Sequence, residues 1–282
     1  MGDVPLDLVW VFQAIWAWAV AGSAALNHVP LMLVFFVITW FAASGIAGLG
    51  RYIATAGSER LALYLIDPLT KWLVFIFAIT LYMMAVAWPQ GRTITDLLVS
   101  LRIITDTPMD DIVLWSAGLL LVWIGIAIGF YALAKSLGAK RTRQGLILQP
   151  KTFAEKAAFL LVLCPTAGIL EEIVFRGFLL ILFTQWAGGD IWSAALTTSI
   201  LFGLGHAYQG AGGILATGIF GYTAAVSVIY SGSLVPAIIA HTLYDMATVV
   251  IYRPISEPPP GIDDFDLRRA ERPFGWMTGR GF

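Results

Sequence analysis

Long apolar runs separated by short polar stretches make up most of the chain. A helix needs about 20 predominantly apolar residues to cross the hydrocarbon core of a bilayer. Runs of roughly this length lie at residues 6–26, 29–48, 72–88, 112–134, 154–187, 191–206, 212–231 and 234–252. The pattern therefore predicts an all-α, polytopic membrane protein with about eight transmembrane helices.

The fifth run, 154–187, is longer than one straight crossing requires. It predicts a tilted helix, or a helix that bends at Pro165, because a proline ring disturbs the helical turn before it. The first run has no Lys or Arg before it. We interpret it as a retained span, since a cleaved signal peptide begins with basic residues.

The basic residues between the runs predict the orientation of the chain in the membrane. Six Lys and Arg residues lie in 135–156 and three in 51–71, whereas 89–111 holds two, together with four aspartates. Lys and Arg accumulate in short loops on the cytoplasmic side. This distribution places the loops 51–71 and 135–156 and both termini in the cytoplasm, and the loop 89–111 on the opposite side.

The composition narrows the range of functions. The chain is 59% hydrophobic and 12% charged, about half the charged share of a soluble domain. Its 17 basic and 18 acidic residues provide no basic surface, which excludes a nucleic-acid partner and leaves membrane lipid as the expected surroundings. The single cysteine, Cys164, excludes an internal disulfide and a cysteine-cluster metal site. The oligomeric state is left open.

The chain divides into three predicted regions. Residues 1–150 hold N-terminal transmembrane helices of unassigned role, without a motif for any function. Residues 151–252 hold several ionisable side chains inside apolar runs and are the predicted catalytic core. Residues 253–282 are rich in proline and charge, which is typical of a flexible tail, here expected in the cytoplasm.

Three charges interrupt the fifth apolar run, in the stretch 171-EEIVFRG-177. A charge near the bilayer centre costs roughly 2.5–3.5 kcal/mol on insertion scales, so intramembrane charges are candidates for function. Glu172 and Arg176 stand four residues apart, on one helix face, and are expected to pair. Glu171 is rotated about 100° from Glu172 and is expected to face a cavity. The alternative, an ion-pair cluster of all three that only holds helices together, stays open.

Two further polar elements follow, 202-FGLGH-206 and 241-HTLYD-245. Phe202 and His206 share a helix face, as do His241 and Asp245. Each histidine alone has an ordinary structural explanation, a satisfied core residue for His206 and a local hydrogen bond to Asp245 for His241. Together with Glu171, however, the two histidines suit the activation of a water molecule, with the carboxylate as general base and the imidazoles orienting water or stabilising an oxyanion.

The same three residues leave a metal centre open as an alternative. Glu171, His206 and His241 are the donor types of a hydrolytic zinc site, so a divalent metal such as zinc would use them as ligands. The zinc motif H-E-x-x-H of soluble metalloproteases is absent from the sequence. A metal is therefore allowed by the residues but not indicated by their spacing.

The three motifs, in this order and on separate predicted spans, resemble the CPBP family. This family comprises CAAX-prenyl proteases and bacteriocin-processing enzymes and is also called the Abi family. The resemblance covers roughly residues 150–252 and implies an all-helical intramembrane endopeptidase. It implies that Glu171 is the general base, His206 its partner, His241 the oxyanion stabiliser and Asp245 its assistant. Glu172, Arg176 and Phe202 would then be structural supports.

One departure from the family pattern concerns the substrate. The eukaryotic prenyl-protein proteases end the third motif with Asn, whereas this chain has Asp245, as bacterial-type members do. An ionised Asp cannot donate a hydrogen bond to an oxyanion, so Asp245 would act by orienting His241 or in its protonated form. We therefore expect a peptide or lipidated-protein substrate in a bacterial cytoplasmic membrane, without specifying prenylation.

Two other functions compete with proteolysis. The first is a membrane immunity or binding protein that keeps the fold but does not cleave. The second is a transporter that uses Glu171 and the histidines as a proton relay. Transporters often contain internal repeats, and none is visible in the sequence, so this function ranks last.

Overall fold

The computed structural model describes residues 60–136, 150–186 and 188–251. Their regular secondary structure is entirely helical, which confirms the all-α prediction for this part of the chain. The runs 6–26 and 29–48 and the tail 253–282 lie outside the described residues. The total of eight spans and the division into three regions therefore stay predictions.

Each of the six later apolar runs forms helix in the structure. The main elements are α3 (Arg60–Tyr82), α5 (Met109–Ser136), α7 (Phe153–Ala158), α8 (Cys164–Glu172), α9 (Leu180–Trp186), α10 (Ile191–Gly205), α11 (Gly210–Ser231) and α12 (Val235–Ile251). The short elements are η1 (Met83–Ala87), η2 (Trp88–Gln90), α4 (Ile94–Ser100), η3 (Phe159–Leu163), η4 (Ile173–Leu179) and η5 (Ala207–Gln209).

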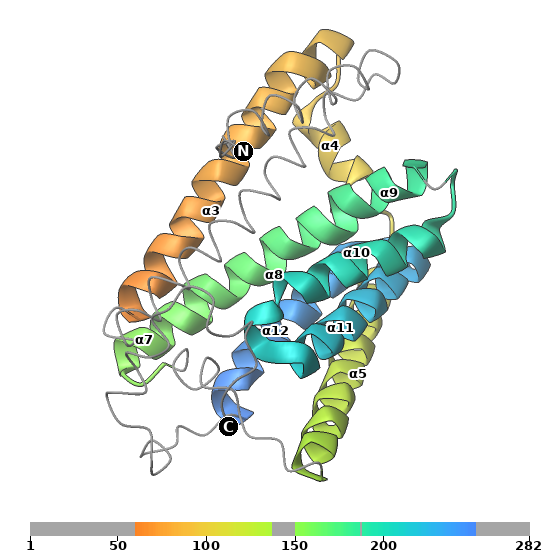
Figure 1. Ribbon diagram of the computed structural model, residues 1–282. Coiled ribbons are helices and arrows are strands. Elements are labelled where there is room, and N and C mark those ends of the chain that lie inside the picture. The colour runs from red at the N-terminus through yellow and green to blue at the C-terminus, as the bar shows by residue number, and fades with distance from the viewer. Residues whose placement is uncertain (1–59, 137–149, 187, 252–282) are drawn as a thin grey trace, which may run out of the picture.

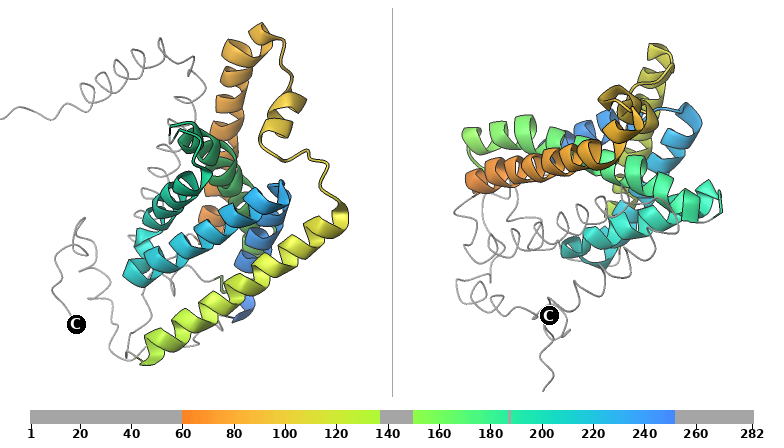
Figure 2. Two further views of the ribbon diagram at one scale, coloured as in Figure 1. Left: turned by 90° about the vertical axis from the view of Figure 1, so that its right-hand side faces the viewer. Right: turned by 90° about the horizontal axis from the view of Figure 1, so that it is seen from above.

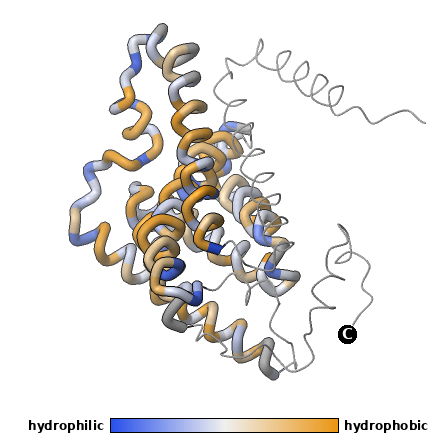
Figure 3. Tube along the Cα trace, turned by 90° about the vertical axis from the view of Figure 1, so that its left-hand side faces the viewer, coloured by the Kyte–Doolittle hydropathy of each residue, from blue (hydrophilic) through white to orange (hydrophobic). Residues whose placement is uncertain are grey.

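Four helices within the described ranges are long and apolar enough to cross a membrane. They cover Arg60–Thr80, Met109–Leu133, Phe153–Gln185 and Gly210–Ser231, while Ile191–Gly205 is a shorter apolar helix. Many of their large apolar side chains are exposed, for example Leu73 and Phe77 on α3 and Leu121 on α5. The trace coloured by hydropathy shows the apolar character of most helices (Figure 3). An outer surface of this kind suits lipid rather than water.

The third span begins earlier than the sequence predicted. Residues 51–71 were expected to form a loop, but α3 already begins at Arg60, and Lys71 lies well inside it. Lys71 pairs with Asp67 through a Nζ–Oδ2 distance of 2.7 Å. An ion pair at a spacing of four residues offsets the cost of both charges, so the helix continues where the polar residues suggested an end.

The long run 154–187 is one continuous helical rod built from α7, η3, α8, η4 and α9 (Figure 1). Two of its segments, η3 and η4, have the wider turns of a π-helix. The first of these lies directly before Pro165, where a proline ring would otherwise meet the carbonyl group four residues earlier. The wider turn thus allows the proline to sit inside the rod.

Helix α3 runs parallel to the first half of this rod. The Arg60 guanidinium lies 3.2 Å from the Glu155 carboxylate, and further along Trp72 donates a hydrogen bond of 3.0 Å to the Thr166 hydroxyl. The two contacts have almost the same sequence separation, 95 and 94 residues. Helices that keep one offset over several turns lie side by side in the same direction, so α3 becomes the neighbour of the segment that carries the two glutamates.

Glycines bring the helices of the core unusually close together. A Cβ atom on Gly168 of α8 would lie 2.9 Å from the backbone nitrogen of Thr242 on α12. A Cβ on Gly203 of α10 would lie 2.5 Å from the carbonyl oxygen of Ile214 on α11. Small residues permit this kind of approach between membrane helices. Figure 2 shows the result, with α10 and α11 lying along each other and α12 close to α8.

Candidate active site

The residues of the three sequence motifs come together where α8 passes into η4. Glu171, Glu172 and Arg176 belong to this rod, Phe202 and His206 lie at the end of α10, and His241 and Asp245 lie on α12. The close α8–α12 approach at Gly168 sets the distance between the first and third motifs.

Glu172 occupies the buried centre. It is 0% exposed, and its Oε1 atom lies 2.9 Å from Nη1 of Arg176 and 2.7 Å from Nδ1 of His241. The pairing with Arg176 is the one that their spacing predicted. The contact with His241 was not predicted, and it joins two residues that lie 69 positions apart in sequence, on different helices. A carboxylate between two donors is held in one orientation.

This contact also fixes the orientation of the His241 ring. An ionised carboxylate only accepts hydrogen bonds, so Nδ1 of His241 carries a proton and donates it to Glu172. The opposite ring nitrogen, Nε2, lies 3.9 Å from Oε2 of Glu171 and 3.6 Å from Oδ2 of Asp245. Both carboxylates thus face the side of the ring that is turned away from Glu172.

The local hydrogen bond between His241 and Asp245, which the sequence offered as a structural explanation for His241, does not form. Their separation of 3.6 Å is an ion-pair distance, longer than a hydrogen bond. The hydrogen bond of the imidazole goes to Glu172 instead, because the packing of α8 on α12 brings that carboxylate closer than one helical turn brings Asp245. Asp245 remains an electrostatic neighbour of Nε2.

Glu171 differs from Glu172 in its contacts. Its side chain is 25% exposed, whereas that of Glu172 is 0% exposed. Its Oε2 atom is itself buried and accepts no hydrogen bond from the described residues. Its carboxylate interacts electrostatically with His206 and His241. Oε2 of Glu172 also accepts no hydrogen bond from the described residues, but the Glu172 side chain is fully buried. Of the two glutamates, Glu171 is therefore the one that a reacting molecule can reach.

His206 caps the C-terminal end of α10. Its Nδ1 atom lies 2.9 Å from the carbonyl oxygen of Phe202, and because a carbonyl oxygen only accepts, Nδ1 is the protonated nitrogen. In the neutral ring, Nε2 then carries a lone pair. A backbone carbonyl on one ring nitrogen is a common way to set the role of the other.

Phe202 connects the charged and the imidazole groups. The Arg176 guanidinium lies 4.2 Å from the centre of its ring, a cation–π contact. The His206 ring lies 4.6 Å away, and the His241 ring lies 6.1 Å away and is nearly perpendicular. One aromatic side chain therefore touches all three cationic or imidazole side chains of the cluster and fixes their spacing.

Two residues near the site were not singled out from the sequence. Trp123 of α5 packs edge-on against His241, with ring centres 5.7 Å apart. Lys71 of α3 is close enough to Glu171 to interact with it electrostatically. Lys71 did carry a signal, since it and Asp67 are two charges at helical spacing beside an apolar run. Trp123 carried none, because a tryptophan in an apolar helix is ordinary.

The donor set was also considered for a metal ion. Across the described ranges, no group of three His, Cys, Asp or Glu side chains is arranged to hold one. The Nδ1 atoms of His206 and His241 are used by a carbonyl and by Glu172, so only the Nε2 atoms of the two rings remain as donors. The reaction derived from this geometry uses no metal.

Comparison with known families agrees with the geometry of this segment. Residues 153–247 match the family model described as type II CAAX prenyl endopeptidase, Rce1-like. This segment is similar to Rce1-like domains. It covers about a third of the chain and contains all three motifs, which confirms the resemblance drawn from them. No curated protein and no solved structure matches the chain.

The match supports a coarse functional class for this segment. The Rce1-like family is a protease family, so the match supports an intramembrane endopeptidase of the CAAX-protease type. The apolar helices and the family together support an integral membrane protein. Helices α3, α4 and α5 lie outside the matched segment, although α3 and α5 contribute Lys71 and Trp123 to the surroundings of the site.

Proposed function

We propose that the protein hydrolyses a peptide bond in a membrane-associated peptide or lipidated protein, with Glu171 as the general base. The observation that carries this proposal is the buried Oε2 atom of Glu171, which accepts no hydrogen bond from the described residues. It lies 3.9 Å from Nε2 of His241, a distance that leaves both atoms free to contact one reacting group. A base and an oxyanion donor are needed side by side in this way.

The neighbouring ion pair supports Glu171 without taking part in the reaction. Glu172 holds Arg176 and His241, and Arg176 lies over the ring of Phe202. The positive charge of Arg176 offsets the negative charge of Glu172 inside the membrane helices. The second glutamate thus fixes the His241 ring, while the first remains available for chemistry.

In the proposed reaction, the imidazoles of His206 and His241 have different roles beside Glu171. A water molecule donates one hydrogen bond to Nε2 of His206 and transfers its other proton to Glu171 as its oxygen attacks the carbonyl carbon of the substrate. The C–O bond forms, and the carbonyl oxygen becomes an oxyanion. A protonated Nε2 of His241 donates to this oxyanion. When the C–N bond breaks, Glu171 returns the proton to the leaving amine, so the general base is regenerated.

Asp245 has a supporting part in this scheme. Its carboxylate lies 3.6 Å from Nε2 of His241 and favours the protonated, donating form of the ring. It does not contact the oxyanion itself, since an ionised carboxylate has no proton to donate. The role proposed for the residue is therefore to hold the charge of His241.

A direct test uses the full chain, purified and reconstituted in proteoliposomes. Fluorogenic membrane-anchored peptides, one farnesylated and one acylated near the C-terminus, are incubated in water enriched in oxygen-18. Hydrolysis predicts a shorter peptide whose new carboxylate carries one labelled oxygen, as measured by mass spectrometry. An absence of product with both anchors and with a panel of flanking sequences would contradict the proposal and favour a non-catalytic immunity protein.

A further inference from the structure

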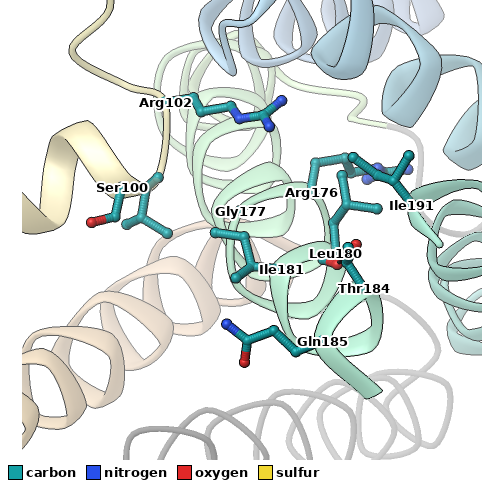
Figure 4. Close-up of a pocket in the computed structure, with 10 residues that line it drawn as sticks. Ser100, Arg102, Arg176, Gly177, Leu180, Ile181, Thr184, Gln185 and Ile191 are labelled. Carbon is teal, nitrogen blue, oxygen red and sulfur yellow. Dashed lines mark hydrogen bonds between the residues drawn. The ribbon is translucent and has the colours of Figure 1, made fainter. Parts of the chain in front are cut away.

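A cavity lies between the C-terminal end of α4 and the η4–α9 half of the rod, and Glu171, His206 and His241 are not among its lining residues. Its volume is about 280 Å³. Figure 4 shows Ser100 and Arg102 on one side of it, Ile181 and Gln185 on the rod, and Ile191 on the opposite side. Its lining combines polar side chains with apolar ones on both sides. A cavity with both kinds of lining suits an amphiphile rather than a purely polar ion.

Arg102 is the cation that we assign to a ligand in this cavity. The other arginine of the lining, Arg176, has Nη1 on Glu172 and its guanidinium over Phe202, while its buried Nη2 atom has no hydrogen-bond partner among the described residues. Arg102 uses Nη1 to donate a hydrogen bond of 3.1 Å to the carbonyl oxygen of Val228. A guanidinium has five N–H donors, so it can hold an anionic oxygen as well.

The backbone holds Arg102 in an unusual conformation. Its φ of 57° is the only positive value among non-glycine residues in the described ranges. Its N–H donates to the carbonyl of Val99 over 2.9 Å, and its carbonyl oxygen accepts from the N–H of Leu234 over 2.8 Å. Left-handed backbone at a large side chain costs free energy and persists only where surrounding contacts hold it. These contacts fix the place from which the guanidinium extends.

The remaining polar groups select for a ligand that also carries a donor. The Ser100 hydroxyl already donates to the carbonyl of Asp96, and the Thr184 hydroxyl donates to the carbonyl of Leu180. Both hydroxyl oxygens can therefore only accept from a ligand. The site offers the Arg102 guanidinium, two acceptors and the amide of Gln185. A phosphate that is linked to a hydroxyl or ammonium group matches this set.

The cavity lies at the end of the bundle where aromatic residues gather. The rings of Trp115 and Tyr230 are stacked 6.3 Å apart, and Trp192 lies 5.9 Å from Tyr230. Trp192 follows the cavity residue Ile191 directly. Trp and Tyr are enriched at the level of the lipid headgroups, so this end of the protein corresponds to a membrane interface.

We propose that this cavity binds a phospholipid whose headgroup combines a phosphate with a hydroxyl or ammonium donor. Arg102 holds the phosphate, and the hydroxyls of Ser100 and Thr184 accept hydrogen bonds from the headgroup. The apolar side chains of Ile181 and Ile191 contact the start of the acyl chains. The site is separate from Glu171 and does not depend on the proposed protease activity.

The test measures lipid binding to the full-length protein in detergent by native mass spectrometry. The probes are phosphatidylglycerol, phosphatidylcholine, which has a phosphate but no headgroup donor, and inorganic phosphate. Wild type is expected to bind phosphatidylglycerol about tenfold more tightly than phosphatidylcholine, because only the phosphatidylglycerol headgroup can donate to the Ser100 and Thr184 hydroxyls. Arg102→Gly should bind both lipids about tenfold more weakly, since it removes the charge-assisted contact with their phosphates, and should stay folded because glycine accepts a positive φ.

Two further variants make the test decisive. Arg92→Gln, which removes a charge from the same end of the bundle but not from the cavity, should keep wild-type binding. Ile181→Trp fills the cavity without altering Arg102 and should also weaken the binding of both lipids. Wild-type binding by Arg102→Gly or by Ile181→Trp would overturn the proposal. Equal binding of the two lipids would also overturn it, as would displacement of phosphatidylglycerol by inorganic phosphate at equal concentration, which would indicate a site for free anions.

Discussion

The Nδ1 atom of His241 lies 2.7 Å from Oε1 of Glu172, not beside Glu171 or Asp245. This single contact separates the two adjacent glutamates into a supporting and a reacting residue. It also directs Nε2 of His241 toward the region that Glu171 and Asp245 share. The predictions below follow from this arrangement.

Replacement of Glu172 should damage both stability and turnover. Glu172→Gln leaves Arg176 buried without an anion, and breaking a buried ion pair costs about 3–5 kcal/mol. We expect a clear fall in Tm in detergent and at least a tenfold fall in kcat, because His241 loses its fixed orientation. Glu155→Gln is the matched control in the same rod, since it breaks the more exposed pair with Arg60 and should cost only about 1–2 kcal/mol. Equal losses in the two variants would argue against the central role of Glu172.

Phe202 should matter more than its apolar character suggests. Phe202→Leu keeps a large apolar side chain but removes the ring that contacts Arg176, His206 and His241. A loss of about 1–3 kcal/mol in unfolding free energy is expected from the smaller volume and the lost cation–π contact, together with a reduced kcat. Phe178→Leu, on the neighbouring rod and packed against the hydrophobic cluster, serves as control. It should lower stability without a comparable change in kcat.

The close approach of α8 and α12 predicts a strong effect of one methyl group. Gly168→Ala places a Cβ 2.9 Å from the backbone nitrogen of Thr242, so the two helices must separate. Overpacking of this kind costs about 1–3 kcal/mol and should also lengthen the Glu172–His241 contact. Gly125→Ala in α5 meets no described atom within 4 Å and should be neutral or stabilising through helix propensity. Comparison of Tm and kcat for the two variants tests whether this packing sets the site.

The start of α10 predicts a pH-dependent contribution to stability outside the membrane spans. The Ser193 hydroxyl and the Trp192 N–H donate to the Asp190 carboxylate and hold its pKa below the usual range. The stabilisation is therefore fully present above the unfolded-state pKa of about 4 and is lost as the pH falls through the lower folded-state pKa. The Tm difference between wild type and Asp190→Ala should narrow as the pH is lowered from 6 to below 4. A constant difference over this range would show that the carboxylate charge is not what stabilises the helix.

The sequence predicted the elements whose signals are local. The apolar runs predicted six helices that the structure describes, and the four-residue spacing of Glu172 and Arg176 predicted a contact that forms over 2.9 Å. The order of the three motifs pointed to the family that residues 153–247 match. These features depend on helix periodicity and on the cost of charge in a membrane, both of which can be evaluated from neighbouring residues alone.

Features that depend on packing between distant segments were not predicted. The partner of His241 could not be chosen from the sequence, because Asp245 was the nearer residue along the chain and Glu172 is nearer in space. The start of α3 was misplaced because Asp67 and Lys71 compensate each other, which a residue-by-residue hydropathy pattern does not include. The position of Trp123 against His241 depends on how α5 crosses α12.

The central claim is that Glu171, and no other carboxylate of the cluster, activates the attacking water. The most direct measurement is the kcat of Glu171→Gln, a change that keeps the side-chain shape but removes the base, with Asp106→Asn in the α4–α5 connection as control. We expect Glu171→Gln to be expressed and folded, with a Tm near that of wild type, but to lose turnover by about a thousandfold or more. Asp106→Asn should keep wild-type turnover. Turnover within a few-fold of wild type in folded Glu171→Gln would contradict the account.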